Sequence, residues 1–121
     1  MSGDLQIHIG DSLDTMGQRF VDAWHRAEHD VPDADQPERH VGFATFEQFT
    51  RIMTPRRLDL LRRVHRAPPR SIRSLALALG RDYRRVHEDV ETLVSAGLLD
   101  RDATGLHADY ASVRVETLIT L

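Results

Sequence analysis

Cysteine and lysine are both absent from this chain of 121 residues, and it has no long apolar run. Without cysteine, disulfides, thiolate zinc sites, iron–sulfur clusters and thiol nucleophiles are excluded. The longest apolar stretch, at 75–79, is far shorter than the roughly 20 residues of a membrane-spanning helix. No basic segment followed by an apolar one opens the chain, so we expect no secretory signal and a cytoplasmic location.

The motifs of enzymes are also scarce. No phosphate-cradling glycine loop, no G-x-S-x-G turn and no pair of carboxylates at a strand end occurs in the sequence. We therefore expect no enzymatic activity and no cofactor. The length suits one compact domain with an added element.

Charge is distributed unevenly although the formal net charge is only −3. Residues 1–50 hold three arginines and ten acidic residues, and residues 86–121 hold two arginines and seven acidic residues. Residues 51–85 hold eleven arginines against two aspartates. Such a concentrated basic block is typical of a surface that meets nucleic-acid phosphates, and the alternative is a solvated helical face balanced by acids elsewhere in the fold.

The first fifty residues predict a strand, a helix and a linker. Alternating apolar residues at 5–9 predict a strand with one buried face. Apolar residues spaced by three and four, including Phe20 and Trp24, predict an amphipathic helix over 12–29. The proline-rich acidic segment 30–39 is typical of a linker, and an extended piece at 41–46 leads into a short helix through Phe46 and Ile52.

Three helices and a hairpin are predicted next. Thr54-Pro55 begins a helix with Leu58, Leu61 and Val64 buried, and prolines at 68 and 69 end it. A second helix runs from the cap Ser71 to Gly80, and a third from the cap Asp82 to about residue 96. Residues 98–110 predict a hairpin with Gly105 in its turn, and 113–121 a final strand.

This order predicts a mainly α fold with a small β part (α+β), a winged helix-turn-helix in which the hairpin is the wing. We expect residues 51–112 to form the DNA-binding domain, flanked by an N-terminal part, 1–50, and a C-terminal strand, 113–121. Stepping 100° per residue from a buried Val86 turns Arg84, Glu88, Glu91 and Ser95 outward. The predicted DNA-contacting residues are Ser71, Arg73, Arg81, Tyr83, Arg84, Arg85, His87 and Arg101.

Within this set the roles differ. Arg81, Arg84 and Arg85 are the predicted readers of bases or phosphates, and Ser71 with Arg73 suits a phosphate at a helix N-terminus. Glu88 is expected to pair with Arg84 or Arg85 rather than to read a cytosine. Arg101 and His107 are the donors of the wing, which three aspartates make acidic.

The segments outside the three helices hold more apolar residues than a minimal winged helix needs. We expect 1–29 and 113–121 to form a homodimer or partner interface that contains Ile7, Phe20, Trp24, Val113 and Val115. The alternative function is a winged-helix module that binds and neutralises a partner protein without specific DNA readout.

His25 to His29 spells H-x-x-E-H, the inverted pattern of zinc proteases. Two histidines four apart on a helix can share a zinc ion, but no third ligand stands out in the sequence. We therefore expect a polar helical face here, with no metal site and no catalysis.

From Phe43 to Tyr110 the chain resembles a family of small archaeal and bacterial regulators related to MarR-type winged-helix proteins. The similarity also extends to the N-terminal residues Phe20, Asp22, Ala23 and Trp24. The matching positions are Met53-Thr54-Pro55, Arg57, Leu58, Leu61, Ser71-Ile72, Leu75-Ala76, Gly80-Arg81-Asp82-Tyr83, Val86, Asp89-Val90 and Ala96-Gly97-Leu98-Leu99.

Members of this group are similar to the antitoxins of TumE-type toxin–antitoxin pairs. The resemblance implies binding to double-stranded DNA, autoregulation of transcription and a toxin protein as partner, and it implies no small ligand. The acidic wing and the short turn at 104–106 depart from the family pattern, and this leaves the wing contacts open.

Overall fold

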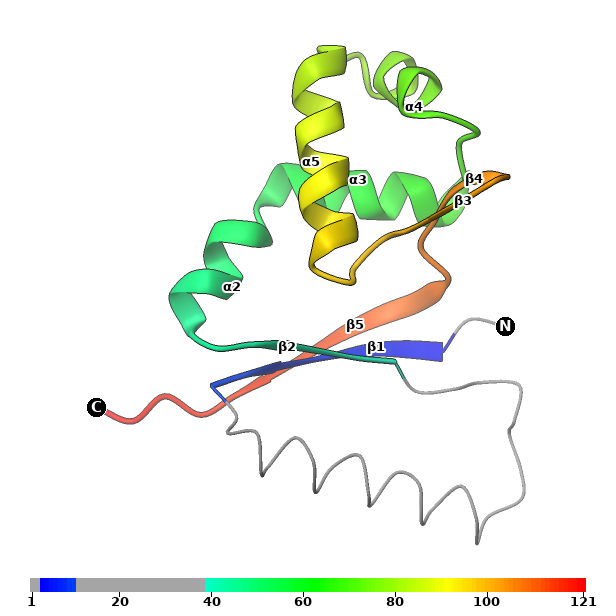
Figure 1. The fold of residues 1–121 in the computed structure, drawn as a ribbon. Coiled ribbons are helices and arrows are strands. Elements are labelled where there is room, and N and C mark those ends of the chain that lie inside the picture. The colour runs from blue at the N-terminus through cyan, green and yellow to red at the C-terminus, as the bar shows by residue number, and fades with distance from the viewer. Residues whose placement is uncertain (1–2, 11–38) are drawn as a thin grey trace, which may run out of the picture. The chain divides into compact units, whose positions relative to one another are not determined.

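The computed structural model describes residues 3–10 and 39–121 (Figure 1). This part of the chain holds four helices and five strands, which confirms the expected mixture of α and β structure. It divides into two compact units, the described residues up to 48 together with 111–121 (unit 1) and residues 49–110 (unit 2). No described helix has the length and apolar character needed to cross a bilayer.

Unit 1 is built on a three-stranded sheet. β1 (Gly3–Ile9) lies in the centre, with β2 (Arg39–Phe43) on one side and β5 (Tyr110–Thr117) on the other. β1 and β2 run parallel, with Ile7 opposite Val41. The predicted strand at 5–9 is confirmed, but its alternation is wrong at one position, because His8 is buried together with Ile7 and Ile9. β5 begins three residues earlier than expected and ends at Thr117.

α2 (Phe46–Ile52) follows β2 and confirms the short helix expected there. Thr45 begins this helix with its hydroxyl, which accepts from the Gln48 amide at 3.1 Å. The expected helix at 12–29 and most of the expected linker lie outside the described residues.

α3 (Pro55–Arg66) opens unit 2 as predicted. The Thr54 hydroxyl accepts from the Arg57 amide at 3.3 Å, and Pro55 occupies the first turn, where a missing amide costs nothing. The buried side chains are Leu60, Leu61 and Val64. Leu58 is only partly buried, so the predicted stripe is shifted by part of a turn toward Leu60.

α4 (Ile72–Leu79) and α5 (Tyr83–Ser95) are joined by the tight turn at 80–82. Gly80 adopts the left-handed conformation (φ 64°, ψ 35°), which lets the chain reverse without a Cβ clash. The Asp82 carboxylate then caps α5 by accepting from the Arg85 amide at 3.3 Å. Ile72, Leu75 and Ala76 of α4 pack in the same core as the α5 side chains Val86, Val90 and Leu93.

β3 (Asp100–Asp102) and β4 (Gly105–His107) form an antiparallel hairpin. The turn consists of Ala103 and Thr104, so Gly105 lies in the strand and not in the turn as expected. Its φ of 129° and a Cβ position only 2.1 Å from the Pro69 carbonyl oxygen explain why glycine is needed. The Leu106 amide donates to that carbonyl at 3.0 Å, which fixes the hairpin to the segment before α4.

Candidate nucleic-acid interface

The outward face of α5 is the one predicted from helical rotation. Arg84, Glu88, Glu91 and Ser95 are exposed, and Val86, Val90 and Leu93 are buried. Arg85 is exposed beside Arg84 in the first turn of the helix. The amino-terminal half of the outward face is therefore basic, and the acidic side chains follow one and two turns later.

Side chains from the starts of α4 and α5 lie against each other. The Arg73 guanidinium carbon lies 5.8 Å from the centre of the Tyr83 ring, within the range of a cation–π contact. The Tyr83 and His87 rings follow at 5.9 Å between centroids. We call Arg73, Tyr83, Arg84, Arg85 and His87 the basic face; it combines one residue of α4 with four of α5.

Arg73, Arg84 and Arg85 have no ion-pair partner among the described residues, and each is exposed. The expected pairing of Glu88 with Arg84 or Arg85 is not formed in the described structure. These guanidiniums are consequently available to an external anion. A solvated arginine that meets a phosphate exchanges water for a charge-assisted hydrogen bond.

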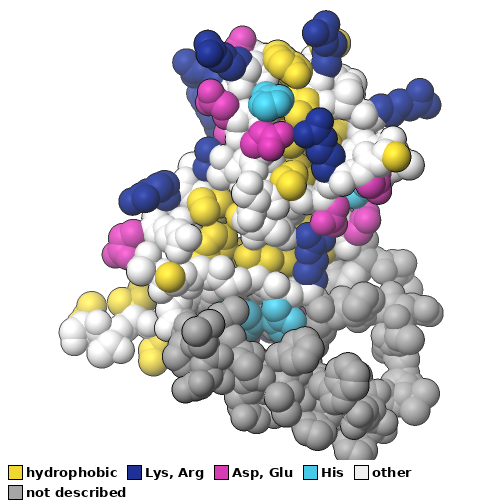
Figure 2. Space-filling model, viewed as in Figure 1, with side chains coloured by type: hydrophobic (Ala, Val, Ile, Leu, Met, Phe, Trp, Pro, Cys, Tyr) yellow, Lys and Arg dark blue, Asp and Glu magenta, His cyan; other side chains and the backbone are white. Residues whose placement is uncertain are grey.

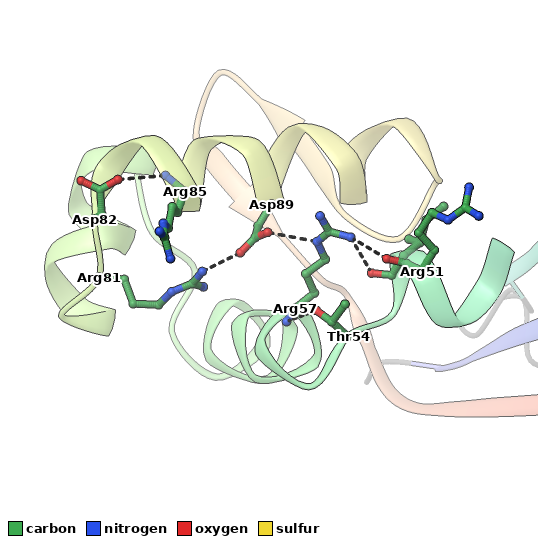
Figure 3. A network of polar contacts seen from close by, with 8 residues as sticks. Arg51, Thr54, Arg57, Arg81, Asp82, Arg85 and Asp89 are labelled. Carbon is green, nitrogen blue, oxygen red and sulfur yellow. Dashed lines mark hydrogen bonds and ion pairs between the residues drawn. The ribbon is translucent and has the colours of Figure 1, made fainter. Parts of the chain in front are cut away.

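Arg81, also predicted as a reader, belongs to a different arrangement, in which its guanidinium is paired within the protein. Its guanidinium donates to Asp89 at 2.8 Å, and the side chain is only 21% exposed (Figure 3). The other Asp89 oxygen accepts from Arg57 of α3 at 3.0 Å. Asp89 thus joins α3, the turn before α5 and α5 itself, and Arg81 is part of this network.

Arg57 is the member of the network whose structural role the sequence did not suggest. Besides Asp89, its guanidinium donates to the carbonyl oxygens of Arg51 and Ile52 at 3.1 and 3.0 Å. These carbonyls end α2, where a positive charge is favourable. Arg57 and Asp89 are 32 positions apart in sequence, and a single sequence contains no local signal for such a pair.

Ser71 is also occupied within the protein. Its hydroxyl accepts from the Ser74 amide at 3.1 Å, and the Ser74 hydroxyl accepts from the Ser71 amide at 3.3 Å. This reciprocal capping box begins α4. The cap predicted at Ser71 is confirmed, and its hydroxyl serves the helix.

The hairpin presents its basic side chains beside acids. Arg101 of β3 donates to Glu91 of α5 at 3.1 Å, and His87 lies 3.8 Å from the same carboxylate. In the turn, the Thr104 hydroxyl and amide both donate to Asp102, at 2.6 and 2.8 Å. These bonds, from the hydroxyl above all, hold the pKa of the Asp102 carboxyl below its ordinary value. His107 lies 3.2 Å from this carboxylate.

Of the residues expected at a dimer or partner interface, the structure describes three. Ile7 is completely buried, so it is not available to a partner. Val113 is partly buried and Val115 is 44% exposed, both on β5. Phe20, Trp24, His25 and His29 lie outside the described residues, and among the described ones no cluster of three or more metal-ligating side chains occurs.

The formal charge differs between the two units. Unit 2 contains twelve arginines and eight acidic residues, a formal charge of +4, although the whole chain is at −3. Figure 2 shows dark blue arginine side chains over unit 2 with acidic side chains between them. The positive surface is therefore a property of unit 2, interrupted locally by Glu88, Glu91 and the hairpin aspartates.

The HVO_A0114 family model matches residues 52–115, a range that contains α3, α4, α5 and the hairpin. No curated protein and no solved structure matches the chain.

Proposed function

We propose that this chain, which belongs to the HVO_A0114 family, is a winged helix-turn-helix protein that binds double-stranded DNA sequence-specifically and regulates transcription. The observation that carries the proposal is the basic face, where three arginines without ion-pair partners among the described residues lie at the starts of α4 and α5. Two helices joined by a tight glycine turn and followed by a hairpin have the order of elements that this motif requires.

Size and chemistry support α5 as the recognition helix. A helix with its side chains is about 10–12 Å across, close to the roughly 12 Å width of a B-form major groove. Arg84 and Arg85 stand in the first turn of α5, the part of a recognition helix that approaches base edges. Arginine suits guanine because its guanidinium can donate two parallel bonds to O6 and N7.

Arg73 suits a different role in the same interface. It stands in the first turn of α4 and packs over Tyr83, so its charge is held beside α5. From there it would meet the phosphate backbone, which carries no base information. The hairpin would act as the wing, with Arg101 released from Glu91 at little cost because both side chains are about half exposed.

The test compares three arginine-to-alanine variants on two duplexes. One duplex is the region directly upstream of the gene for this chain, and the other is a scrambled duplex of the same composition. We expect Arg84→Ala to weaken binding to the upstream duplex by about tenfold or more and to leave the scrambled duplex almost unchanged. Arg73→Ala should weaken both duplexes alike and reduce the salt slope by about one.

Arg62→Ala is the matched control, because Arg62 is an exposed arginine of α3 that is already paired with Asp59. Its binding should equal that of the unmodified protein. Equal losses in all three variants, or an unmodified protein that does not prefer the upstream duplex, would refute the assignment.

A second candidate function is a winged-helix module that binds and neutralises a partner protein. The observation in its favour is the acidic half of the outward α5 face, where Glu88 and Glu91 would oppose phosphates, together with the exposed Leu77 on α4. Co-expression with the product of the neighbouring gene separates the two. A stable complex that persists in Arg84→Ala, with no preference for the upstream duplex, would favour the protein partner.

A further inference from the structure

β5 lies at the edge of the unit 1 sheet. The strand order is β2-β1-β5, and no described strand pairs with the outer side of β5. On its inner side, the Ser112 hydroxyl donates to Asp4 of β1. An edge strand of eight residues leaves a row of amide and carbonyl groups that can pair with another strand.

The side chains of β5 alternate between two faces. Val113 and Val115 share one face, and Arg114 and Glu116 share the other. Val115 is 44% exposed, and two further apolar residues, Leu118 and Ile119, follow the strand with most of their surface exposed. Arg114 is exposed and has no ion-pair partner in the described part of the chain.

We propose that a second copy of this chain occupies this edge, and that the two β5 strands pair antiparallel with Val115 at the two-fold axis. An antiparallel pair of identical strands in a continuous sheet is symmetric, so each contact away from the two-fold axis occurs twice. In this register Arg114 stands opposite Glu116 of the other copy, and Val113 stands opposite Thr117. The result is a six-stranded sheet, a common size for sheets in proteins.

Charge selects this register over its neighbours. A two-fold axis at Arg114 places two arginines opposite each other, and an axis at Glu116 does the same with two glutamates. Like charges directly opposite each other destabilise a strand pair, whereas opposite charges stabilise it. An axis at Val113 leaves Arg114 opposite the uncharged Ser112. Only the axis at Val115 places Arg114 and Glu116 opposite side chains of the other sign.

The same register uses the exposed apolar residues. Val115 of one copy meets Val115 of the other on the face where each is now partly exposed. Ile119 comes opposite Ala111, so the residues after Thr117 gain a strand to lie against. On the opposite face, Glu116 lies 3.8 Å from His8 of its own chain and would meet Arg114 of the other copy on its other side.

A charge-swap cycle in sedimentation equilibrium tests this register. The unmodified chain should be dimeric. Arg114→Glu and Glu116→Arg should each weaken the dimer by about tenfold or more, since each places like charges opposite each other. The double variant restores opposite charges and should return close to the original dissociation constant. A monomeric unmodified chain, or a double variant weaker than either single one, would overturn the proposal.

Cysteine scanning gives an independent readout, because the chain has no native cysteine. Under mild oxidation Val115→Cys should form a symmetric disulfide between copies. Thr117→Cys is the control: in this register the two introduced thiols are offset by four residues, about 14 Å along the strands, and should not link. Cross-linking at position 117 in preference to position 115 would contradict the register. Circular dichroism shows whether each variant keeps its fold.

These measurements need no DNA, and the dimer proposal does not rest on the DNA-binding proposal. A dimer without preference for the upstream duplex would leave the β5 pairing intact and refute only the proposed function. A monomer that prefers the upstream duplex would support the proposed function and refute only the β5 pairing.

Discussion

Asp89 of α5 is bound by arginines from two other parts of unit 2. It is 14% exposed, and it receives Arg57 on one oxygen and Arg81 on the other. Two arginines around one carboxylate leave each partner satisfied, and removal of the carboxylate would leave two partly buried cations without a counter-charge. Asp89 therefore links α5 to α3 and to the 80–82 turn.

We therefore expect Asp89→Asn to lower the free energy of unfolding by about 2 kcal/mol, as measured by urea denaturation. Asn keeps the size of the side chain but loses the charge. The matched control is Asp59→Asn, whose ion pair with Arg62 is exposed on both sides and should contribute less than about 0.5 kcal/mol. Similar losses of unfolding free energy in the two variants would show that the Asp89 ion pairs contribute no more than an exposed surface pair.

The lowered pKa of the Asp102 carboxyl leads to a prediction of how stability depends on pH. Because Thr104 lowers the pKa of this carboxyl in the folded state, the bonds around Asp102 stabilise the protein above the ordinary pKa. That contribution is lost as pH falls through the lowered value. In Thr104→Val the hydroxyl donor is gone, and the pKa of Asp102 should rise toward its ordinary value in a carbon-13 NMR titration. Thr104→Ser keeps the donor and should keep the low value; identical pKa values in both variants would disprove the cause.

Arg81 illustrates how far single residues can be predicted. Its place in the turn and its charge were evident from the sequence, and both suited a DNA contact. The side chain nevertheless pairs with Asp89, eight positions later, because the turn bends it toward the α3 side of α5. Arg84 points outward, as the 100° rotation predicted, and Arg85 beside it is also exposed. Rotation about one helix is local information, whereas the choice of a partner on a second helix is not.

At the scale of elements, Gly80 and Gly105 both have a positive φ, but they differ in the space around the missing side chain. Around Gly80 an added Cβ would meet nothing within 4 Å, so its φ of +64° is the only reason for glycine. At Gly105 the added Cβ would lie 2.1 Å from the Pro69 oxygen and 2.8 Å from Arg70 Cα. The hairpin therefore lies against the backbone before α4, at a distance that only glycine permits.

The expected result is that Gly80→Ala costs about 1 kcal/mol of unfolding free energy, the usual penalty for a left-handed alanine. Gly105→Ala should cost more than about 3 kcal/mol, because backbone atoms must move as well. Thermal and urea unfolding of the two variants measures both values. A Gly105→Ala protein as stable as Gly80→Ala would show that the hairpin is not held tightly against Pro69.

The helix limits of unit 2 were predictable, because each depends on residues next to it. Thr54-Pro55, Ser71, Gly80 and Asp82 all act as expected. The strands were predicted less well. The hairpin turn lies at residues 103 and 104, whereas the sequence predicted Gly105 in the turn. Gly105 is needed instead for its close contact with Pro69, which is 36 positions away in sequence. His8 is buried where alternation predicted exposure, and its ring nitrogen lies 2.8 Å from the His40 ring of the neighbouring strand.

At the scale of the whole molecule, the two proposals concern different units of the chain. Unit 2 holds the basic face and the complete hairpin, and unit 1 holds the sheet edge proposed to pair with a second copy. Dimerisation would present two basic faces, and two recognition helices about 34 Å apart read successive major grooves. The acidic excess of unit 1 would lower non-specific attraction to DNA without altering the basic face.

A fragment of residues 49–110 tests this division of roles. Because this unit contains the buried side chains of α3, α4 and α5, we expect the fragment to remain folded and helical by circular dichroism. It should be monomeric and bind the upstream duplex more weakly than the full chain. Its salt slope in fluorescence anisotropy should be about half as steep, since half the phosphates are contacted. An equal slope would indicate that the full chain also binds as one copy.

The sequence by itself determined the mixed α and β composition, the caps and ends of the helices in unit 2, and the outward face of α5. Each of these depends on propensities and periodicity within a few residues. Only the tertiary structure decided that Arg81 pairs with Asp89, that Gly105 lies against Pro69 and that β5 lies beside β1. These contacts join residues from separate elements, and their geometry exists only after the elements have packed.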